Sequence, residues 1–212
     1  MEPKISLFSE SAWDALAELL QRRLLISPKL SEEDLRYCVV EALESFGMFP
    51  KGSIHLNYQH PSFDGKRIDL FLPAYSGQDA IVCELKYDRA IPSGYNQPRS
   101  MKAGAMLNDL LRLAHFKAAT DVERFLIYLT DREMLDYLQN PQNGLAALFS
   151  DPKWPLLVVT SSFLGDRASS VRKMIKVPDI DCSVFTALRR DVGQNHHLSV
   201  FFVQPHSLGL SE

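Results

Sequence analysis

The stretch GKRIDLFLPAYSGQDAIVCELKYDRA, residues Gly65 to Ala90, decides how this chain is interpreted. It contains two apolar runs, KRIDLFL and AIVCELKY, which are joined by PAYSGQD, a segment rich in turn-forming residues. The two runs are therefore predicted to be neighbouring strands. Each nevertheless carries ionisable residues where a buried strand usually carries Val or Ile, namely Asp69, Glu84 and Lys86.

Strand geometry determines which side chains share a face, because successive side chains of a strand point to opposite sides. The first run is expected to place three apolar residues on one face, Ile68, Leu70 and Leu72. The other face then carries Arg67, Asp69 and Phe71. In the second run, Glu84 shares its face with Val82 and Lys86. Pairing the two runs about their turn brings Asp69 opposite Glu84, with Cβ atoms about 4.5–5.5 Å apart.

Two carboxylates placed opposite each other inside a sheet repel, and each loses several kcal/mol of hydration on burial. A divalent cation between them removes this repulsion, because Mg²⁺ binds one or two carboxylates together with water and phosphate oxygens. Lys86 is expected on the same face as Glu84, where its ammonium group would activate a water or stabilise charge on a phosphate. The pattern therefore predicts a metal-dependent site that acts on phosphate esters.

Two other interpretations of these charges stay open. A chain of this length holds on the order of one Glu-x-Lys tripeptide by chance, and EPK at Glu2 to Lys4 is a second example. Charged residues on an edge strand also discourage aggregation. The ELK tripeptide at Glu84 to Lys86 differs from EPK because it lies within an apolar strand and follows a strand that carries an Asp.

The order of elements around these residues resembles that of the PD-(D/E)xK nuclease superfamily, also called restriction-endonuclease-like. A helix, a strand bearing Asp, a turn, a strand bearing Glu-x-Lys and a further helix follow one another between residues 31 and 117. Residues Arg67 to Asp69, RID, stand where the superfamily has its Pro-Asp, and Ile68 replaces the Pro. Residues Glu84 to Lys86, ELK, stand where it has (Asp/Glu)-x-Lys.

This resemblance implies hydrolysis of phosphodiester bonds in nucleic acid, with DNA as the expected substrate and a homodimer as a possible assembly. It implies Mg²⁺, or Mn²⁺ in its place, held by Asp69, Glu84 and the backbone carbonyl of Leu85, with Lys86 assisting the attacking water. The alternative is a non-catalytic domain of the same type that binds nucleic acid or a protein partner. An unrelated α/β domain in which the motif is coincidental is a third interpretation.

Many members of the superfamily add an acidic residue from the helix before the core strands. Five acids compete for this role in SEEDLRYCVVEALE, which starts at Ser31. A helical wheel places Glu32 near the middle of the apolar stripe and Arg36 at its margin, with Glu41 and Glu44 opposite. Glu32 is therefore expected to join the catalytic site, with Glu33 in reserve. An acid in a first helical turn is also explained by the helix dipole alone.

The helix after the Glu-x-Lys strand supplies basic residues. Arg99 and Lys102 lie near its start, where backbone N–H groups favour an anion, so they are candidate nucleic-acid contacts. Arg112 is expected to pair with Asp109, three residues earlier. A second basic group comprises Arg167, Arg172, Lys173 and Lys176. It would extend a nucleic-acid surface, or it is solvated loop charge.

The chain as a whole is typical of a globular protein. It has 212 residues, of which 46% are hydrophobic and 23% charged, and a formal net charge of −3, which excludes a globally basic nucleic-acid-binding surface. The three cysteines are far apart in apolar runs and are expected to be reduced core thiols. The first residues lack the pattern of a signal peptide and no run is long enough to span a membrane, so a cytoplasmic protein is expected.

A single domain, residues 1–212, is expected, because neither a repeat nor a linker interrupts the chain. Helices are expected at 9–25 (or from 11), 31–47, 99–120 and 131–140, and strands at 53–60, 66–72, 80–87, 123–130, 154–162, 182–190 and 197–205. Residues 1–30 are expected to add a helix to a nuclease-like core at 31–117, residues 118–205 to complete the sheet, and residues 206–212 to form a mobile tail. This order predicts a three-layer α/β/α fold with a central mixed sheet.

Overall fold

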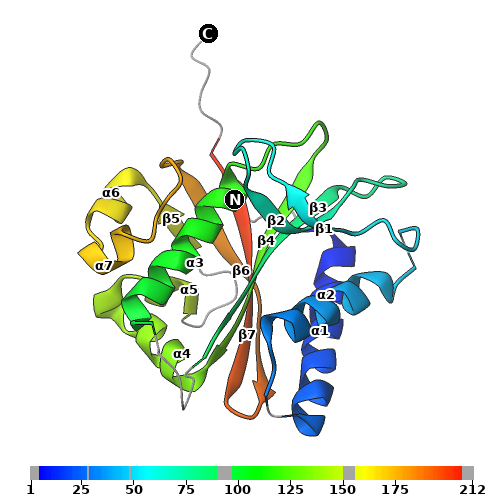
Figure 1. Cartoon of the computed structure of the whole chain (residues 1–212), viewed down its shortest axis with the longest axis horizontal. Helices are drawn as coiled ribbons and strands as arrows, with labels where there is room; N and C mark the ends of the chain where they lie inside the picture. Colours follow the sequence, from blue (N-terminus) through cyan, green and yellow to red (C-terminus); the bar gives the residue numbers. More distant parts are fainter. Residues whose placement is uncertain (1–4, 28, 48, 90–96, 150–155, 207–212) are drawn as a thin grey trace.

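A seven-stranded sheet with the strand order β1-β2-β3-β4-β7-β6-β5 runs through the protein, and helices cover both of its faces (Figure 1). The computed structural model describes residues 5–27, 29–47, 49–89, 97–149 and 156–206. Strands β3 and β4 are parallel, whereas the other neighbouring strands are antiparallel. The mixed α/β class predicted from the sequence is therefore confirmed.

The described elements follow one another in this order: α1 (Leu7–Ile26), α2 (Glu32–Glu44), β1 (His55–Gln59), β2 (Arg67–Leu72), β3 (Ala80–Asp88), α3 (Arg99–Ala114), β4 (Val122–Asp131), α4 (Arg132–Gln139), the 3-10 helix η1 (Pro141–Asn143), α5 (Ala146–Phe149), β5 (Leu156–Val159), α6 (Ser161–Gly165), α7 (Ser169–Arg172), β6 (Cys182–Gly193) and β7 (His196–Pro205).

Most boundaries match the expected ones, and the exceptions have local causes. Helix α1 starts earlier than expected because the Ser6 hydroxyl accepts a hydrogen bond from the N–H of Ser9 and so caps the helix. Helix α3 ends at Ala114 rather than at residue 120. Four short helices between β4 and β6 were not predicted, namely η1, α5, α6 and α7. Segments of three to five residues are too short to show a helical period.

Two separate hydrophobic cores lie on the two faces of the sheet. Helices α1 and α2 pack on one face, where their buried residues join those of β2, β3, β4, β6 and β7. Helices α3 to α7 pack on the other face. This arrangement places α2 and α3 on opposite sides of β2 and β3, as Figure 1 shows. The strands that carry the candidate site residues are therefore reached by a helix from each side.

The expected alternation along β2 is only partly confirmed. Leu70 and Leu72 are buried in the core under α1 and α2, as expected for residues on one face. Ile68 is also buried, but it belongs to the core under α3, so the prediction that it shares a face with Leu70 was wrong. The alternation is broken at Asp69, where β2 leaves its partner strand, as described below.

Several smaller expectations concern cysteines, the membrane and the C-terminus. All three cysteines, Cys38, Cys83 and Cys182, are buried and free, as predicted. Among the described residues, no helix is both long enough and apolar enough to cross a membrane. Residues 207–212 of the expected tail and residues 90–96 of the expected loop before α3 lie outside the described residues.

Candidate functional site

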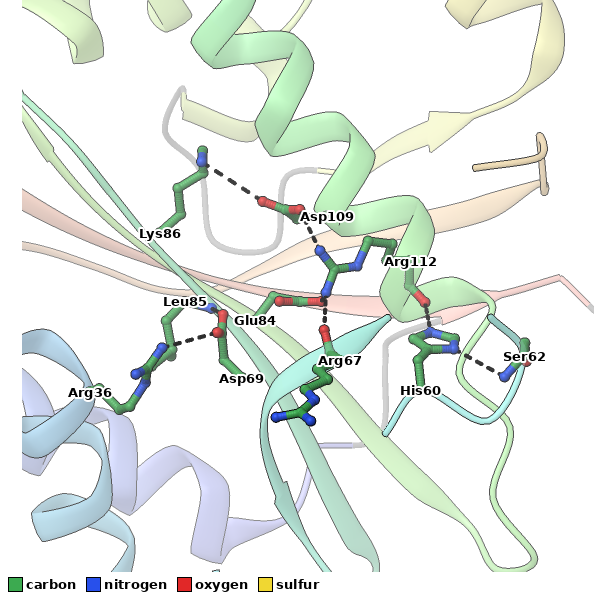
Figure 2. A network of polar contacts seen from close by, with 10 residues as sticks. All are labelled: Arg36, His60, Ser62, Arg67, Asp69, Glu84, Leu85, Lys86, Asp109 and Arg112. Carbon is green, nitrogen blue, oxygen red and sulfur yellow. Dashed lines mark hydrogen bonds and ion pairs between the residues drawn. The ribbon is translucent and has the colours of Figure 1, made fainter. Parts of the chain in front are cut away.

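The candidate site lies where β2 separates from β3. These strands pair in antiparallel register up to Leu70 opposite Cys83, and continuing this register would place Ile68 opposite Leu85. Instead, the carboxylate of Asp69 accepts a hydrogen bond from the backbone N–H of Leu85, with 2.8 Å between Oδ2 and N (Figure 2). A side chain thus takes the place of a ladder bond, and β3 no longer pairs with β2 beyond this point.

Asp69 and Glu84 lie at this separation, one residue beyond the last pair that the two strands form, Leu70 and Cys83. The two acids are close enough for the charge of Asp69 to act on the carboxyl group of Glu84. Glu84 is only 3% exposed, and its burial raises the pKa of its carboxyl group well above the usual value. The negative charges of Asp109 and Asp69 raise this pKa further, whereas Arg112 lowers it. Neighbouring carboxyl groups are stabilised by a proton or by positive charge beside them.

Each of these two carboxyl groups also contacts an arginine, and the two arginines come from opposite layers (Figure 2). Arg36 of α2 places Nη2 3.2 Å from Oδ1 of Asp69. Arg112 of α3 places Nη2 2.5 Å from Oε1 of Glu84 and also donates a hydrogen bond to the backbone carbonyl of Arg67. Sequence reasoning missed both contacts, because each joins residues that are far apart in the chain.

Helix α3 contributes a second acid, Asp109, which was predicted only as a partner of Arg112. That pair is confirmed, with 3.5 Å between Arg112 Nη1 and Asp109 Oδ1. The other carboxylate oxygen of Asp109 lies 4.0 Å from the ammonium nitrogen of Lys86. Burial raises the pKa of Asp109 to about 6, although Lys86 and Arg112 oppose this shift. Lys86 thus lies on the α3 side of the sheet, as Glu84 does, and contacts an acid that the sequence did not predict for it.

Glu32 lies near Asp69 and Lys86, as the sequence predicted. The residue is exposed, and the backbone of Tyr87 is among the groups that lower the pKa of its carboxyl group. Partial burial of the carboxyl group, followed by the charge of Asp69, raises its pKa, and Lys86 acts in the opposite direction. The reserve candidate, Glu33, instead forms an ion pair with Arg36 at 2.7 Å.

The capping of α2 explains how Glu32 is directed toward the strands. The hydroxyl of Ser31 accepts a hydrogen bond from the N–H of Asp34, and the carboxylate of Asp34 accepts one from the N–H of Ser31. This reciprocal pair fixes the start of the helix, so that Glu32 is its first residue. The acid that was selected from five candidates is therefore the one that lies beside the ends of the core strands.

The basic residues predicted at the start of α3 have other partners. Arg99 pairs with Glu133 at 2.5 Å, and Lys102 donates a hydrogen bond to the carbonyl of Arg89 at 2.8 Å. They line a cavity of about 330 Å³ together with Gln97, Pro98, Asp131, Glu133 and Met134. None of the hydrogen bonds or ion pairs of the described residues joins Arg99 or Lys102 to Asp69 or Glu84.

One member of the second basic group also has a structural role. The guanidinium group of Arg167 lies over the ring of Phe163, 4.4 Å from its centroid, and donates a hydrogen bond to the carbonyl of Asn143. This residue therefore joins α6 to the end of η1. These contacts account for the position of the Arg167 side chain without a nucleic-acid partner.

The donor atoms at the separation of β2 and β3 suit a hard divalent cation. They comprise the carboxylates of Asp69 and Glu84 and the carbonyl of Leu85, which faces the same strand edge as the N–H of Leu85. Mg²⁺ takes one or two carboxylates and fills its remaining positions with water and substrate oxygens. Oε1 of Glu84, although buried beside Arg112, makes no aligned hydrogen bond. The residues present therefore fit the expected ion.

The part of the chain that the structure describes contains no group of three or more His, Cys, Asp or Glu side chains arranged to hold a metal ion. A site built from two carboxylates and a carbonyl does not require such a group. No family model, curated protein or solved structure matches this chain.

Proposed function

We propose that this protein is a metal-dependent nuclease that hydrolyses phosphodiester bonds of nucleic acid, with DNA as its expected substrate and a restriction-endonuclease-like fold. The observation that carries the proposal is that Asp69 and Glu84 are neighbours at the point where β2 leaves β3, with Asp69 fixed there by its hydrogen bond from the N–H of Leu85. The order of β2, β3, α3 and β4 supports the fold assignment, because β3 and β4 are parallel and α3 connects them.

The proposed roles follow from the position of each group. Asp69, Glu84 and the carbonyl of Leu85 would hold Mg²⁺ or Mn²⁺, which when bound lowers the pKa of a water and neutralises charge on the scissile phosphate. The ammonium group of Lys86, on the same side of the sheet as Glu84, would donate hydrogen bonds to the attacking water or to a phosphate oxygen. The carboxyl group of Glu32 would accept a hydrogen bond from that water.

Positive groups around the site support a polyanionic substrate although the net charge of the chain is −3. Arg36, Lys86 and Arg112 all contact acidic side chains of the site. Arg67 is exposed two residues before Asp69, and its guanidinium group makes no ion pair with the described residues. A phosphate backbone that approaches the separation of β2 and β3 would therefore meet a free guanidinium group at its rim.

A second candidate function, a non-catalytic domain that binds nucleic acid or a protein partner, is favoured by the two arginines. Arg36 and Arg112 balance the charges of Asp69 and Glu84 inside the protein. A domain that had lost catalysis would retain such internal ion pairs, because removing one partner leaves a buried charge without compensation. In that case Lys86 would serve only to pair with Asp109.

The two functions are distinguished by cleavage of a mixed panel of single- and double-stranded DNA and RNA, with Mg²⁺, with Mn²⁺ and with a chelator. The wild type, Lys86→Ala and a control, Lys117→Ala at an exposed position, are compared. We expect metal-dependent cutting that Lys86→Ala reduces by roughly 100-fold or more and the control retains. Cutting that survives Lys86→Ala contradicts the proposed site. Binding without cutting by the wild type favours the non-catalytic domain.

A further inference from the structure

We infer that Asp109 is a positioning residue, which holds the amine of Lys86 away from Glu84 and ready for the reacting water or phosphate. The inference rests on the proposed nuclease function, because it assigns Lys86 a catalytic task. Asp109 belongs to neither tripeptide of the resembled pattern and lies on a helix that packs over the strands rather than on the strands themselves. Its part in the site follows from the contacts of its two carboxylate oxygens.

Each oxygen of Asp109 contacts a different cation. Oδ2 lies 4.0 Å from Nζ of Lys86, and Oδ1 lies 3.5 Å from Nη1 of Arg112. The other terminal nitrogen of Arg112 contacts Glu84. Glu84, Arg112, Asp109 and Lys86 therefore form a row of alternating charge that begins and ends on β3 and passes through α3, as Figure 2 shows.

This row explains why Lys86 does not pair with Glu84. The two residues are two positions apart on one strand and share a face, and a lysine side chain is long and flexible enough to reach such a neighbour. A Lys86–Glu84 ion pair would occupy both the proposed metal ligand and the proposed catalytic amine. Asp109 provides a competing partner for Lys86, while Arg112 covers Glu84 from the same helix.

The surroundings of Asp109 argue against a purely stabilising role. Its side chain is only 16% exposed, and burial is the largest influence on its carboxyl group. Buried ion pairs contribute little net stability, because the lost hydration offsets the attraction between the charges. An apolar side chain at position 109, one turn before Leu113, would pack there without the loss of hydration that a buried charge entails. A buried acid that holds two cations at set positions is instead expected where their placement matters.

A double-mutant cycle with kinetics separates positioning from general stabilisation. We expect Asp109→Asn to lower kcat by roughly 10- to 100-fold with little change in KM, because a misplaced catalytic group costs about that much. In the Lys86→Ala background, Asp109→Asn should cause no further loss. Asp109→Glu keeps the charge and should recover part of kcat. The control Asp136→Asn removes an exposed ion pair with Arg132 and should leave kcat unchanged.

A second measurement does not require activity. The metal-free protein is acylated briefly with an amine-reactive reagent, and modification of individual lysines is followed by mass spectrometry of peptides. Lys86 should react several-fold faster in Asp109→Asn than in the wild type, because its amine has lost its partner. Lys117, which is exposed, serves as the internal standard, and Asp136→Asn again serves as the control.

The outcomes separate this inference from the proposed function. Absence of cleavage by the wild type overturns the nuclease and the catalytic part of this inference, and the labelling rates still decide whether Asp109 positions Lys86. Cleavage by the wild type with unchanged kcat in Asp109→Asn overturns this inference alone. Losses that are additive with Lys86→Ala, or equal labelling of Lys86 in both proteins, overturn it as well. If Asp109→Asn unfolds, Asp109→Glu provides the same comparisons with the charge retained.

Discussion

The carboxylate of Asp69 accepts a hydrogen bond from the backbone N–H of Leu85, with 2.8 Å between Oδ2 and N, at the point where β2 and β3 stop pairing. One residue therefore has two tasks in this account. It satisfies a strand N–H that has lost its ladder partner, and it presents its carboxylate to Glu84. The hydrogen bond at the separation of the strands therefore involves the same acid that is proposed to hold the metal.

Two substitutions separate these tasks of Asp69. Asp69→Ala leaves the N–H of Leu85 without an acceptor and should lower the free energy of unfolding by about 1–3 kcal/mol. Asp69→Asn retains a carbonyl oxygen in nearly the same place and should lower it less. Urea denaturation of the metal-free proteins measures both values. Equal losses for the two variants would mean that this hydrogen bond contributes little.

The ion pair between Arg112 and Glu84 predicts an asymmetric response to substitution. Arg112→Met should destabilise the protein by about 3–5 kcal/mol at neutral pH, because it leaves the carboxyl group of Glu84 buried without its cation. Glu84→Gln should change stability by only about 1 kcal/mol, because Arg112 is more exposed than Glu84 and keeps its contact with Asp109. Thermal or urea denaturation checks both values.

The double variant Glu84→Gln/Arg112→Met is the control for this asymmetry. It should be more stable than Arg112→Met alone, because the amide that replaces the carboxyl group of Glu84 has no charge to compensate. A double variant as unstable as the sum of both single variants would show that Arg112 stabilises the fold independently of Glu84. Its hydrogen bond to the carbonyl of Arg67 would then be the main contribution.

The raised pKa of Asp109 predicts a dependence of stability on pH. Between pH 3.8, the ordinary pKa, and about 6, the folded protein retains a proton that the unfolded chain releases. A rise in pH through this window therefore lowers the free energy of unfolding. Asp109→Asn removes this contribution, so its stability should fall less than that of the wild type over the same window. Urea denaturation at several pH values tests this, and parallel curves would contradict it.

Close packing of α3 against α7 predicts a steric effect at Gly104. A Cβ atom added there would meet the carbonyl oxygen of Val171 and lie 2.9 Å from Cβ of Met174. Gly104→Ala should therefore destabilise the protein by about 1–3 kcal/mol, although alanine favours helices. The matched control is Gly165→Ala in α6, where nothing lies within 4 Å of the added atom. Equal melting temperatures of the two variants would contradict this account of the interface.

The sequence predicted the elements and the acidic pair because both depend on local patterns. Alternation and turn residues were sufficient to predict the antiparallel pairing of β2 and β3, but the observed register ends at Leu70 and Cys83, one residue before Asp69 and Glu84. The helical period placed Glu32 on the apolar stripe of α2, whereas the residue is exposed. The alternation failed at Ile68, which lies beyond the last pair of β2 with β3 and packs in the core under α3. Nothing in the local pattern of β2 indicates where that separation occurs.

The ion pairs across layers required the three-dimensional structure. Arg36 and Asp69 are joined only because α2 and β2 pack together, and Lys86 and Asp109 only because α3 covers the strands. A partial signal was present in α3, where Asp109 and Arg112 lie one turn apart among buried leucines. Two opposite charges on the packed side of a helix indicate partners in the layer beneath, but they do not identify them.

The central claim is that the pair of Asp69 and Glu84 exists to hold a divalent cation. Its most direct test is to measure the binding of Mn²⁺ to the wild type and to Asp69→Asn. Electron paramagnetic resonance detects the ion that stays free. We predict a single bound Mn²⁺ per wild-type chain, competition by Mg²⁺, and loss of binding in the variant. Binding should also be tighter at higher pH, because the raised pKa of Glu84 means that its carboxyl group must lose a proton before it binds the ion. Absence of Mn²⁺ binding to the wild type, or equal binding to both proteins, would contradict the claim.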